Sequence, residues 1–171
     1  KELGVDRRPL SGKSRDDEKL DATPGKSPFI KKPRNVILIS VESLSASFVG
    51  AYGGSQGLTP NIDELARDGI KFERVFATGT RTVRGLEALS LGTPPIPGQA
   101  IVRRLKNEHL STIGELLEHQ GFSPFFFYGG YGYFDNMNAF YAGNGFTVLD
   151  RDAIDKVRFE NIWGVADEDL F

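Results

Sequence analysis

Apolar residues occur along this chain in a few short runs, separated by polar and glycine-rich stretches. The first run is VILISV, over 36–41, which is apolar at every position except Ser40 and is followed by Glu42. A continuous apolar run of this length is typical of a central parallel strand that is buried on both faces. We therefore predict a strand over 36–41 that ends at a carboxylate.

Helical and strand patterns alternate after this run. Apolar residues at helical spacing, flanked by Thr59 or Ser111 as caps or closed by glycine, predict helices over 59–69, 82–91 and 111–121. Short apolar or alternating stretches predict further strands over 70–76, 122–128 and 146–150. This alternation predicts an α/β fold with a mainly parallel sheet and helices on both faces.

The composition is that of an ordinary globular protein, with 39% hydrophobic and 26% charged residues among 171. The formal net charge of −2 argues against nucleic-acid binding through bulk charge. Residues 1–33 are polar and lack periodicity, so we predict a flexible arm there and the ordered domain over 34–171. The absence of cysteine excludes disulfides, thiolate metal sites and a cysteine nucleophile.

Glu42 stands at the carboxyl end of the predicted first strand, which is where ligands bind in open α/β sheets. Its carboxylate is a hard oxygen donor on a rigid element, and such a donor suits a divalent metal ion. A lone glutamate at this position can equally cap the next turn or face solvent. The sequence pattern alone leaves both interpretations open.

Threonine and arginine residues gather where the helix over 82–91 begins, in the segment ATGTRTVRG. The free N–H groups and positive dipole end of a helix start suit a phosphate or sulfate group. A threonine hydroxyl at such a place can act as a nucleophile when a cation activates it. The alternative is that Thr80 or Thr82 only caps the helix, with Arg81 and Arg84 on the surface.

Four segments, in their order along the chain, resemble the amino-terminal half of a sulfatase-type domain of the alkaline phosphatase superfamily. They are ILISVESLS, TPNIDELARDGIKF, GTRTVRGLEALSLGTPP and STIGELLEHQGF. The resemblance covers about residues 33–171 and is greatest to the lipoteichoic acid synthase and phosphoglycerol transferase branch. It implies part of an alkaline-phosphatase-like fold. The first residue, which is not Met, and the final DEDLF also lead us to expect a piece of a longer protein.

The resemblance implies roles for residues that match the family motifs. Glu42 in SVES corresponds to a glutamate that binds a divalent metal, usually Mn²⁺, with Zn²⁺ and Mg²⁺ as alternatives. Thr82 in TRTVRG corresponds to the nucleophilic, metal-bound threonine, and Thr80 is the second candidate. Arg84 is expected to contact the substrate phosphate. The implied reaction has two steps: Thr82 attacks a phosphodiester, and an acceptor hydroxyl or water then releases the threonine ester.

The chain also departs from the family pattern. The family completes its metal site with an aspartate and an Asp-His pair, but no Asp-His dipeptide occurs here. We therefore expect the remaining ligands in the carboxyl-terminal half of the same protein, and we expect the isolated chain to be inactive. In the loop YGGYGYFDNMN, Asp135, Asn136 and Met137 stand in the region where better-known members have a tryptophan and an arginine. Either Asp135 and Asn136 bind a polar headgroup, or the loop is structural and anchored by Phe134, Phe140 and Phe146.

The resemblance implies an enzyme that transfers phosphoglycerol or a similar headgroup from a lipid-linked or glycan phosphodiester. The alternatives are a sulfuric or phosphoric ester hydrolase of the same superfamily and a non-catalytic binding module. The C/S-x-P-x-R motif of formylglycine sulfatases is absent, so we do not expect a sulfatase of that kind. Family members carry this domain after membrane helices, which implies a parent protein in the bacterial cytoplasmic membrane with the domain facing the periplasm or the outside. The chain itself has no apolar run of spanning length and is expected to be soluble.

Overall fold

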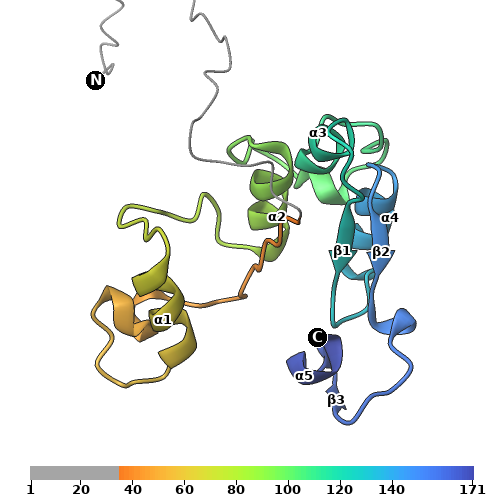
Figure 1. Ribbon diagram of the computed structural model, residues 1–171. Helices are drawn as coiled ribbons and strands as arrows, with labels where there is room; N and C mark the ends of the chain where they lie inside the picture. The colour runs from red at the N-terminus through yellow and green to blue at the C-terminus, as the bar shows by residue number, and fades with distance from the viewer. Residues whose placement is uncertain (1–34) are drawn as a thin grey trace, which may run out of the picture. The chain divides into compact units, whose positions relative to one another are not determined.

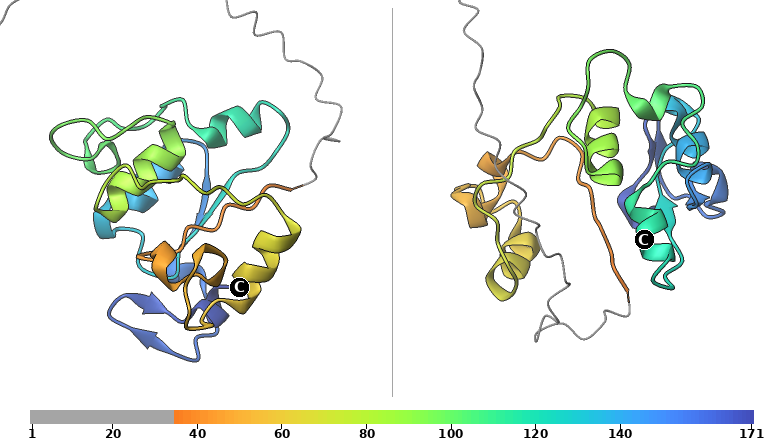
Figure 2. Two further views of the ribbon diagram at one scale, coloured as in Figure 1. Left: turned by 90° about the vertical axis from the view of Figure 1, so that its left-hand side faces the viewer. Right: turned by 90° about the horizontal axis from the view of Figure 1, so that it is seen from above.

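The computed structural model describes residues 35–171, and the predicted arm over 1–33 lies outside them. The chain divides into a unit that ends at Ile37 and a unit over Leu38–Phe171, and the second unit carries the elements shown in Figures 1 and 2. Short 3₁₀ helices are labelled η. In chain order the elements are η1 (Ala46–Phe48), η2 (Gly50–Tyr52), α1 (Pro60–Asp68), α2 (Thr82–Leu91), η3 (Ile101–Arg103), α3 (Ile113–Glu118), β1 (Phe125–Phe127), η4 (Phe134–Asn136), α4 (Met137–Ala142), β2 (Thr147–Leu149), η5 (Arg151–Ala153), β3 (Glu160–Asn161), β4 (Gly164–Val165) and α5 (Asp167–Leu170).

The three predicted helices are confirmed, with small shifts at their ends. α2 begins and ends at the predicted residues, and Gly92 follows it with a φ of 65° that ends the helix. α1 ends before Gly69 and has Pro60 in its first turn, where a missing N–H costs nothing. In α3 the capping hydroxyl belongs to Thr112, which accepts the Glu115 N–H at 3.2 Å, and not to Ser111 as predicted.

Two of the predicted strands form a parallel pair. β1 and β2 pair in the register Phe126 to Val148, and α4, which lies between them in sequence, packs against β2 (Figure 1). A helix that connects two parallel strands in this way is the basic unit of an α/β fold. The α/β class and the parallel pairing therefore follow the sequence prediction.

The core lies between α2, η3 and α4. Its buried apolar residues are Val83, Ala100, Val102, Met137, Phe140 and Tyr141. Phe126 of β1 stacks on Tyr141, with ring centroids 3.7 Å apart, and Phe146 meets the same ring edge-on at 5.1 Å. This cluster lies within the region over 82–149, which also carries exposed apolar side chains such as Leu105. Of the three aromatic anchors predicted for the loop over 128–138, Phe140 is fully buried and Phe146 half-buried, whereas Phe134 is exposed.

A hairpin that the sequence pattern did not predict follows β2. β3 pairs with β4 in antiparallel orientation, and Val165 N–H donates to the carbonyl of Gly129, two residues after β1, at 2.9 Å. Gly130 lies between this hairpin and the side chain that follows β1. A Cβ atom there would lie 2.6 Å from the Trp163 carbonyl oxygen and 2.8 Å from the Tyr128 ring. Glycine is therefore required at position 130.

The strands predicted over 36–41 and 70–76 are wrong. Neither range contains a strand, and large apolar side chains in both are exposed, among them Leu38 at 63%, Ile39 at 65% and Phe72 at 66%. A strand is defined by hydrogen bonds to a neighbouring strand. Within residues 35–171 the paired strands are β1 with β2 and β3 with β4. The apolar pattern of 36–41 and 70–76 therefore has no partner among the described residues.

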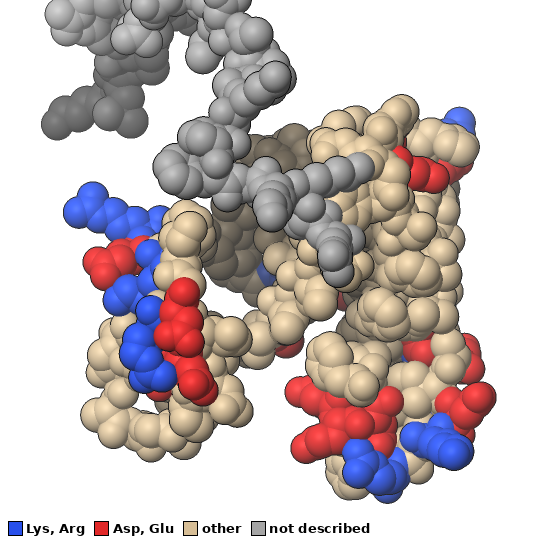
Figure 3. Space-filling model, viewed as in Figure 1, with Lys and Arg blue, Asp and Glu red and all other residues tan. Residues whose placement is uncertain are grey.

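Charged side chains gather over α1 and around the hairpin and α5, with both signs mixed (Figure 3). Over α1 the ion pair between Arg67 and Glu64 is open to solvent, with oxygen and nitrogen 3.9 Å apart. Near α5, Arg158 pairs with Asp169 at 2.7 Å, and the Asp169 side chain is only 3% exposed. Ion pairs open to solvent contribute little to stability, whereas enclosed ones fix local geometry. No helix within residues 35–171 combines the length and the apolar character that crossing a membrane requires.

Candidate functional site

The structure brings together the two residues on which the sequence interpretation depends. The Thr82 hydroxyl donates a hydrogen bond from Oγ1 to Glu42 Oε2 at 3.1 Å. The other carboxylate oxygen, Oε1, accepts from the Ser43 hydroxyl at 3.2 Å. Glu42 and Thr82 are both exposed. An acidic group and a hydroxyl that are far apart in sequence therefore meet at the surface, where a ligand can reach them.

Local sequence explains why the Thr82 hydroxyl is available. Thr82 is the first helical residue of α2, and the N-cap residue is Arg81, whose side chain makes no capping hydrogen bond. The next residue, Val83, is buried in the core and fixes the position of the helix start. The interpretation that Thr82 only caps the helix is therefore wrong for this structure. The second candidate, Thr80, is also exposed, but the hydrogen bond to Glu42 belongs to Thr82.

Arg84 makes a set of contacts inside the molecule. Its guanidinium donates from Nη1 to Glu87 Oε1 at 2.7 Å and to the Ile96 carbonyl at 3.0 Å, and from Nη2 to the Gly98 carbonyl. Glu87 is 1% exposed and also accepts the Ile101 N–H at 2.5 Å. This buried carboxylate thereby ties α2 to the segment that leads into η3. Contact between Arg84 and a phosphate stays a prediction.

Asp135 and Asn136 contact η3. Both residues have left-handed backbone conformations, with φ of 58° and 62°. Asp135 Oδ1 lies 3.4 Å from Arg103 Nε, and Asn136 Nδ2 donates to the Val102 carbonyl at 2.9 Å. Their side chains thus hold the loop after β1 against η3. A direct role of these two residues in headgroup binding stays a prediction.

Tyr128 is a site residue that sequence reasoning missed. It directly follows β1 and is half-buried. Its pKa is raised from 10.0, first because burial disfavours the phenolate and then because Asp135 and Glu42 place negative charge nearby. The phenol is therefore within electrostatic reach of both carboxylates. Its place directly after a parallel strand, where ligands bind in such sheets, was the signal available in the sequence.

The residues present fit one side of a metal site. Glu42 and Thr82 offer oxygen atoms, which are the donors that hard divalent cations prefer. Within residues 35–171 no three His, Asp or Glu side chains gather closely enough to hold a metal ion. Two donors do not complete the coordination of such an ion. Glu42 and Thr82 would supply part of a ligand set.

In this α/β fold a glutamate carboxylate and a threonine hydroxyl meet at the start of α2, and comparison with known proteins gives the family. Residues 34–171 match the sulfatase family, so this chain belongs to that family. Human arylsulfatase A is 30% identical over 67 residues, which are 39% of this chain and 13% of that enzyme. Mouse steryl-sulfatase is 32% identical over 82 residues, which are 47% of this chain and 13% of that enzyme.

A solved structure extends the comparison to the fold. The crystal structure of a protein in the alkaline phosphatase superfamily from Vibrio parahaemolyticus matches with a TM-score of 0.69 and 46% identity, over 74% of this chain and 31% of that one. The predicted alkaline-phosphatase-like fold is thus confirmed. The chain spans about an eighth of the curated relatives and about a third of the solved one. None of these names singles out the phosphoglycerol transferase branch.

Proposed function

We propose that this chain forms the amino-terminal part of a metal-dependent enzyme of the sulfatase family that acts on phosphodiesters. Thr82 is the nucleophile and Glu42 is a metal ligand. The observation that carries the proposal is the 3.1 Å hydrogen bond between Thr82 Oγ1 and Glu42 Oε2. The favoured reaction is transfer of phosphoglycerol or a similar headgroup from a lipid-linked or glycan phosphodiester.

The reaction balances in two displacements at phosphorus. Thr82 Oγ forms a bond to phosphorus while the bond to the departing alcohol breaks, and the hydroxyl proton leaves along the hydrogen bond to Glu42. An acceptor hydroxyl or water then attacks phosphorus, and the threonine oxygen departs and takes up the proton that the acceptor loses. A divalent cation bound at Glu42 and Thr82, Mn²⁺ in the favoured assignment and Zn²⁺ or Mg²⁺ otherwise, would activate the hydroxyl and offset charge on the phosphoryl oxygens.

The remaining metal ligands belong, in this proposal, to the carboxyl-terminal half of the same protein. Support comes from the two oxygen donors found here and from the 31% coverage of the solved relative. The 171-residue chain alone is then inactive and binds metal poorly. The proposal also includes membrane helices upstream of the chain. The domain then lies on the periplasmic or outer side of the bacterial cytoplasmic membrane. Full turnover by the isolated chain would contradict it.

The test is a Thr82→Ala variant in a protein that carries the whole domain, assayed with Mn²⁺ and bis(p-nitrophenyl) phosphate. Removal of a nucleophile is expected to lower kcat by at least ~10³-fold. Thr80→Ala is the matched control and should retain activity, since the hydrogen bond to Glu42 belongs to Thr82. Mass spectrometry of trapped wild-type protein should find the phosphoryl adduct on the peptide that contains Thr82. Unchanged activity of Thr82→Ala would discard Thr82 as the nucleophile.

Hydrolysis of a sulfuric ester is the second candidate, because the similar human and mouse proteins are named arylsulfatase A and steryl-sulfatase. Parallel assays with p-nitrophenyl sulfate and bis(p-nitrophenyl) phosphate separate the two reactions. Faster turnover of the sulfate ester would favour the hydrolase. Turnover of neither ester by the metal-loaded whole domain would favour a binding module without catalysis.

A further inference from the structure

Arg103 offers a guanidinium group that points to solvent, unlike Arg84. Its side chain is 52% exposed, and its described ion pair is with Asp135, between Nε and Oδ1 at 3.4 Å. Arg84 is 19% exposed and is held by Glu87 and by two backbone carbonyls. A guanidinium carries five N–H donors, so Asp135 engages only a part of those on Arg103. Arg103 is therefore the better placed of the two to receive an anion.

The backbone that carries Arg103 is fixed on several sides. η3 packs against α2 on one side and against η4 on the other. Buried Glu87 accepts the Ile101 N–H at 2.5 Å, so the η3 turn is attached to the same helix that begins with Thr82. Val102 is fully buried, and its carbonyl accepts from Asn136 at 2.9 Å and from Asn107 at 2.7 Å. A rigid turn thus presents one exposed cationic side chain.

Asp135 connects this cation to the candidate site. Asp135 and Glu42 are the two carboxylates whose charge acts on the Tyr128 phenol, and Glu42 accepts the hydrogen bond from Thr82. Val102, which precedes Arg103, and Val83, which follows Thr82, belong to the same buried cluster, so the η3 turn that carries Arg103 packs against the helix that begins with Thr82. An arginine oriented by a carboxylate is preorganised to bind a tetrahedral anion through two parallel N–H groups.

We propose that Arg103 is a substrate-binding residue that donates hydrogen bonds to the nonbridging oxygens of the ester anion, with Asp135 as its positioning residue. The inference rests on the proposed function, because it concerns the same anionic ester. In this inference Arg84 has a structural role: it holds the segment before η3 against α2. Asp135 then affects substrate binding through Arg103.

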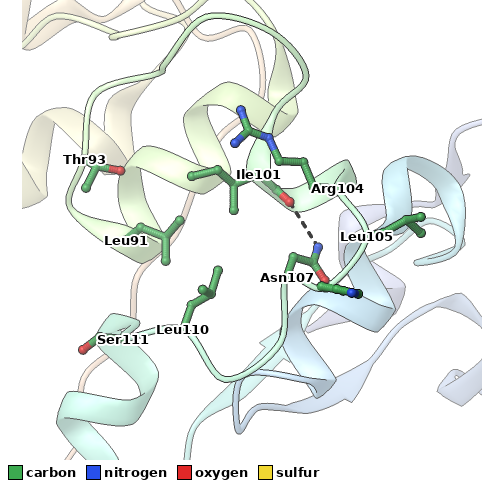
Figure 4. A pocket seen from close by; sticks show the side chains of 9 residues that line it. Leu91, Thr93, Ile101, Arg104, Leu105, Asn107, Leu110 and Ser111 are labelled. Carbon is green, nitrogen blue, oxygen red and sulfur yellow. Dashed lines mark hydrogen bonds between the residues drawn. The ribbon is translucent and has the colours of Figure 1, made fainter.

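The test compares Arg103→Ala with Arg104→Ala in the whole-domain protein, with bis(p-nitrophenyl) phosphate as the substrate. Arg104 is the next residue and carries the same charge. It donates from Nε to the Gln99 carbonyl at 2.8 Å and lines a different hollow, together with Leu91 and Leu110 (Figure 4). Arg103→Ala should raise KM by about tenfold or more and change kcat by less than about threefold. Arg104→Ala should leave both constants near wild type.

Two further measurements separate binding from a structural role. Guanidinium ion at low millimolar concentration should lower the raised KM of Arg103→Ala, because it replaces the missing group, and it should have no such effect on Arg104→Ala. Asp135→Asn should raise KM by a smaller factor than Arg103→Ala, since the guanidinium remains but is less well oriented. Circular dichroism of each variant verifies that the fold is retained.

The outcomes distinguish this inference from the proposed function. If wild-type turnover depends on Thr82 but Arg103→Ala and Arg104→Ala behave alike, the role of Arg103 is overturned and the proposed function stands. A KM effect of Arg103→Ala that guanidinium does not reverse also overturns the role. If Thr82→Ala keeps its turnover, the nucleophile assignment fails, and the KM comparison still reports on the anion site.

Discussion

Two regions of the molecule contain similar apolar patterns but bury them to different extents. In the region over 82–149 one cluster of apolar side chains is enclosed, with Phe140 fully buried, although others such as Leu105 stay exposed. In the region over 38–76 large apolar side chains are exposed, and Phe72 keeps 66% of its accessible surface. An apolar run is therefore buried only where other elements of the fold pack against it.

The two regions are also held by different interactions. Buried apolar contacts join α2, η3 and α4 in the first region, and aromatic stacking joins β1 to α4. In the second, Asp63 of α1 accepts the Ala51 N–H at 2.7 Å, and the Thr59 hydroxyl accepts the Gly50 N–H at 3.0 Å. Polar contacts over a short stretch of chain order η2 against α1 without enclosing a core. Hydrogen bonds fix local geometry, but the net stability that they contribute is small.

The comparison predicts its largest effect when a phenylalanine is replaced by alanine in each of the two regions. Phe140→Ala should lower the free energy of unfolding by about 3–5 kcal/mol, because it leaves a cavity in a closed core. Phe72→Ala should change it by less than ~0.5 kcal/mol, because that ring is mostly exposed. Urea denaturation of both variants of the chain measures the difference. Equal losses would show that residues 38–76 are as well packed as 82–149.

Replacement of a carboxylate should also have different effects on stability in the two regions. Glu87→Ala should cost about 3 kcal/mol, since Arg84 loses its buried partner and the Ile101 N–H loses its acceptor. Glu64→Ala, which removes a pair with Arg67 that is exposed on both sides, should cost less than ~0.5 kcal/mol. Thermal unfolding monitored by circular dichroism is the measurement. A Glu87 variant as stable as the Glu64 variant would refute the role of the buried pair.

Serine hydroxyls should show a smaller difference. Ser90 and Tyr141 share a buried hydrogen bond of 3.0 Å, and Ser90→Ala should cost about 1 kcal/mol because the phenol is left without this partner. Ser47 and Ser45 share an exposed hydrogen bond of 2.9 Å, where water can replace the lost group. Ser47→Ala should therefore be close to neutral in the same unfolding assay. A neutral Ser90→Ala would indicate that water reaches Tyr141.

The smallest effect is local and depends on pH. The Arg158 side chain and two backbone N–H groups donate to Asp169 and hold the pKa of its carboxyl below the ordinary value of 3.8. A lowered native pKa stabilises the fold above the ordinary value, and this contribution is lost as the pH falls through the native pKa. Amide exchange at Phe159 should therefore accelerate as the pH is lowered below about 4.

Asp169→Asn is the control for this pH effect, because an amide cannot titrate. The pH dependence of amide protection at Phe159, corrected for intrinsic exchange, should be flatter in this variant. Tyr128 and Phe140 should keep their protection over the same range, since the contacts of Asp169 lie between residues 158 and 169. A general loss of protection would mean that the acid effect is not local.

Sequence reasoning located the elements that depend on nearby residues. The bounds of α2 follow from its apolar spacing and from Gly92, and both signals lie within the helix or next to it. The strands expected over 36–41 and 70–76 failed because strand formation needs a neighbour, which a local pattern does not specify. The hairpin over 160–165 was missed because strands of two residues are too short to show alternation.

The candidate site could be predicted only in part. Periodicity placed Glu42 after an apolar run, the family resemblance supplied the pairing with Thr82, and the structure gives the hydrogen bond between them. Arg103 was missed because its ion-pair partner, Asp135, lies far along the chain, and Tyr128 because the nearby charge of Glu42 comes from a distant segment. Sequence reasoning assigned no partner to Arg84, whereas in the structure its guanidinium pairs with Glu87, one helical turn away.

At Gly130 the hairpin comes close to Tyr128, beside the candidate site. A Cβ atom at this position would meet both the Trp163 carbonyl and the Tyr128 ring, so both groups lie close to the Gly130 backbone. A side chain at position 130 would therefore have to displace the hairpin backbone at Trp163, the Tyr128 ring or both.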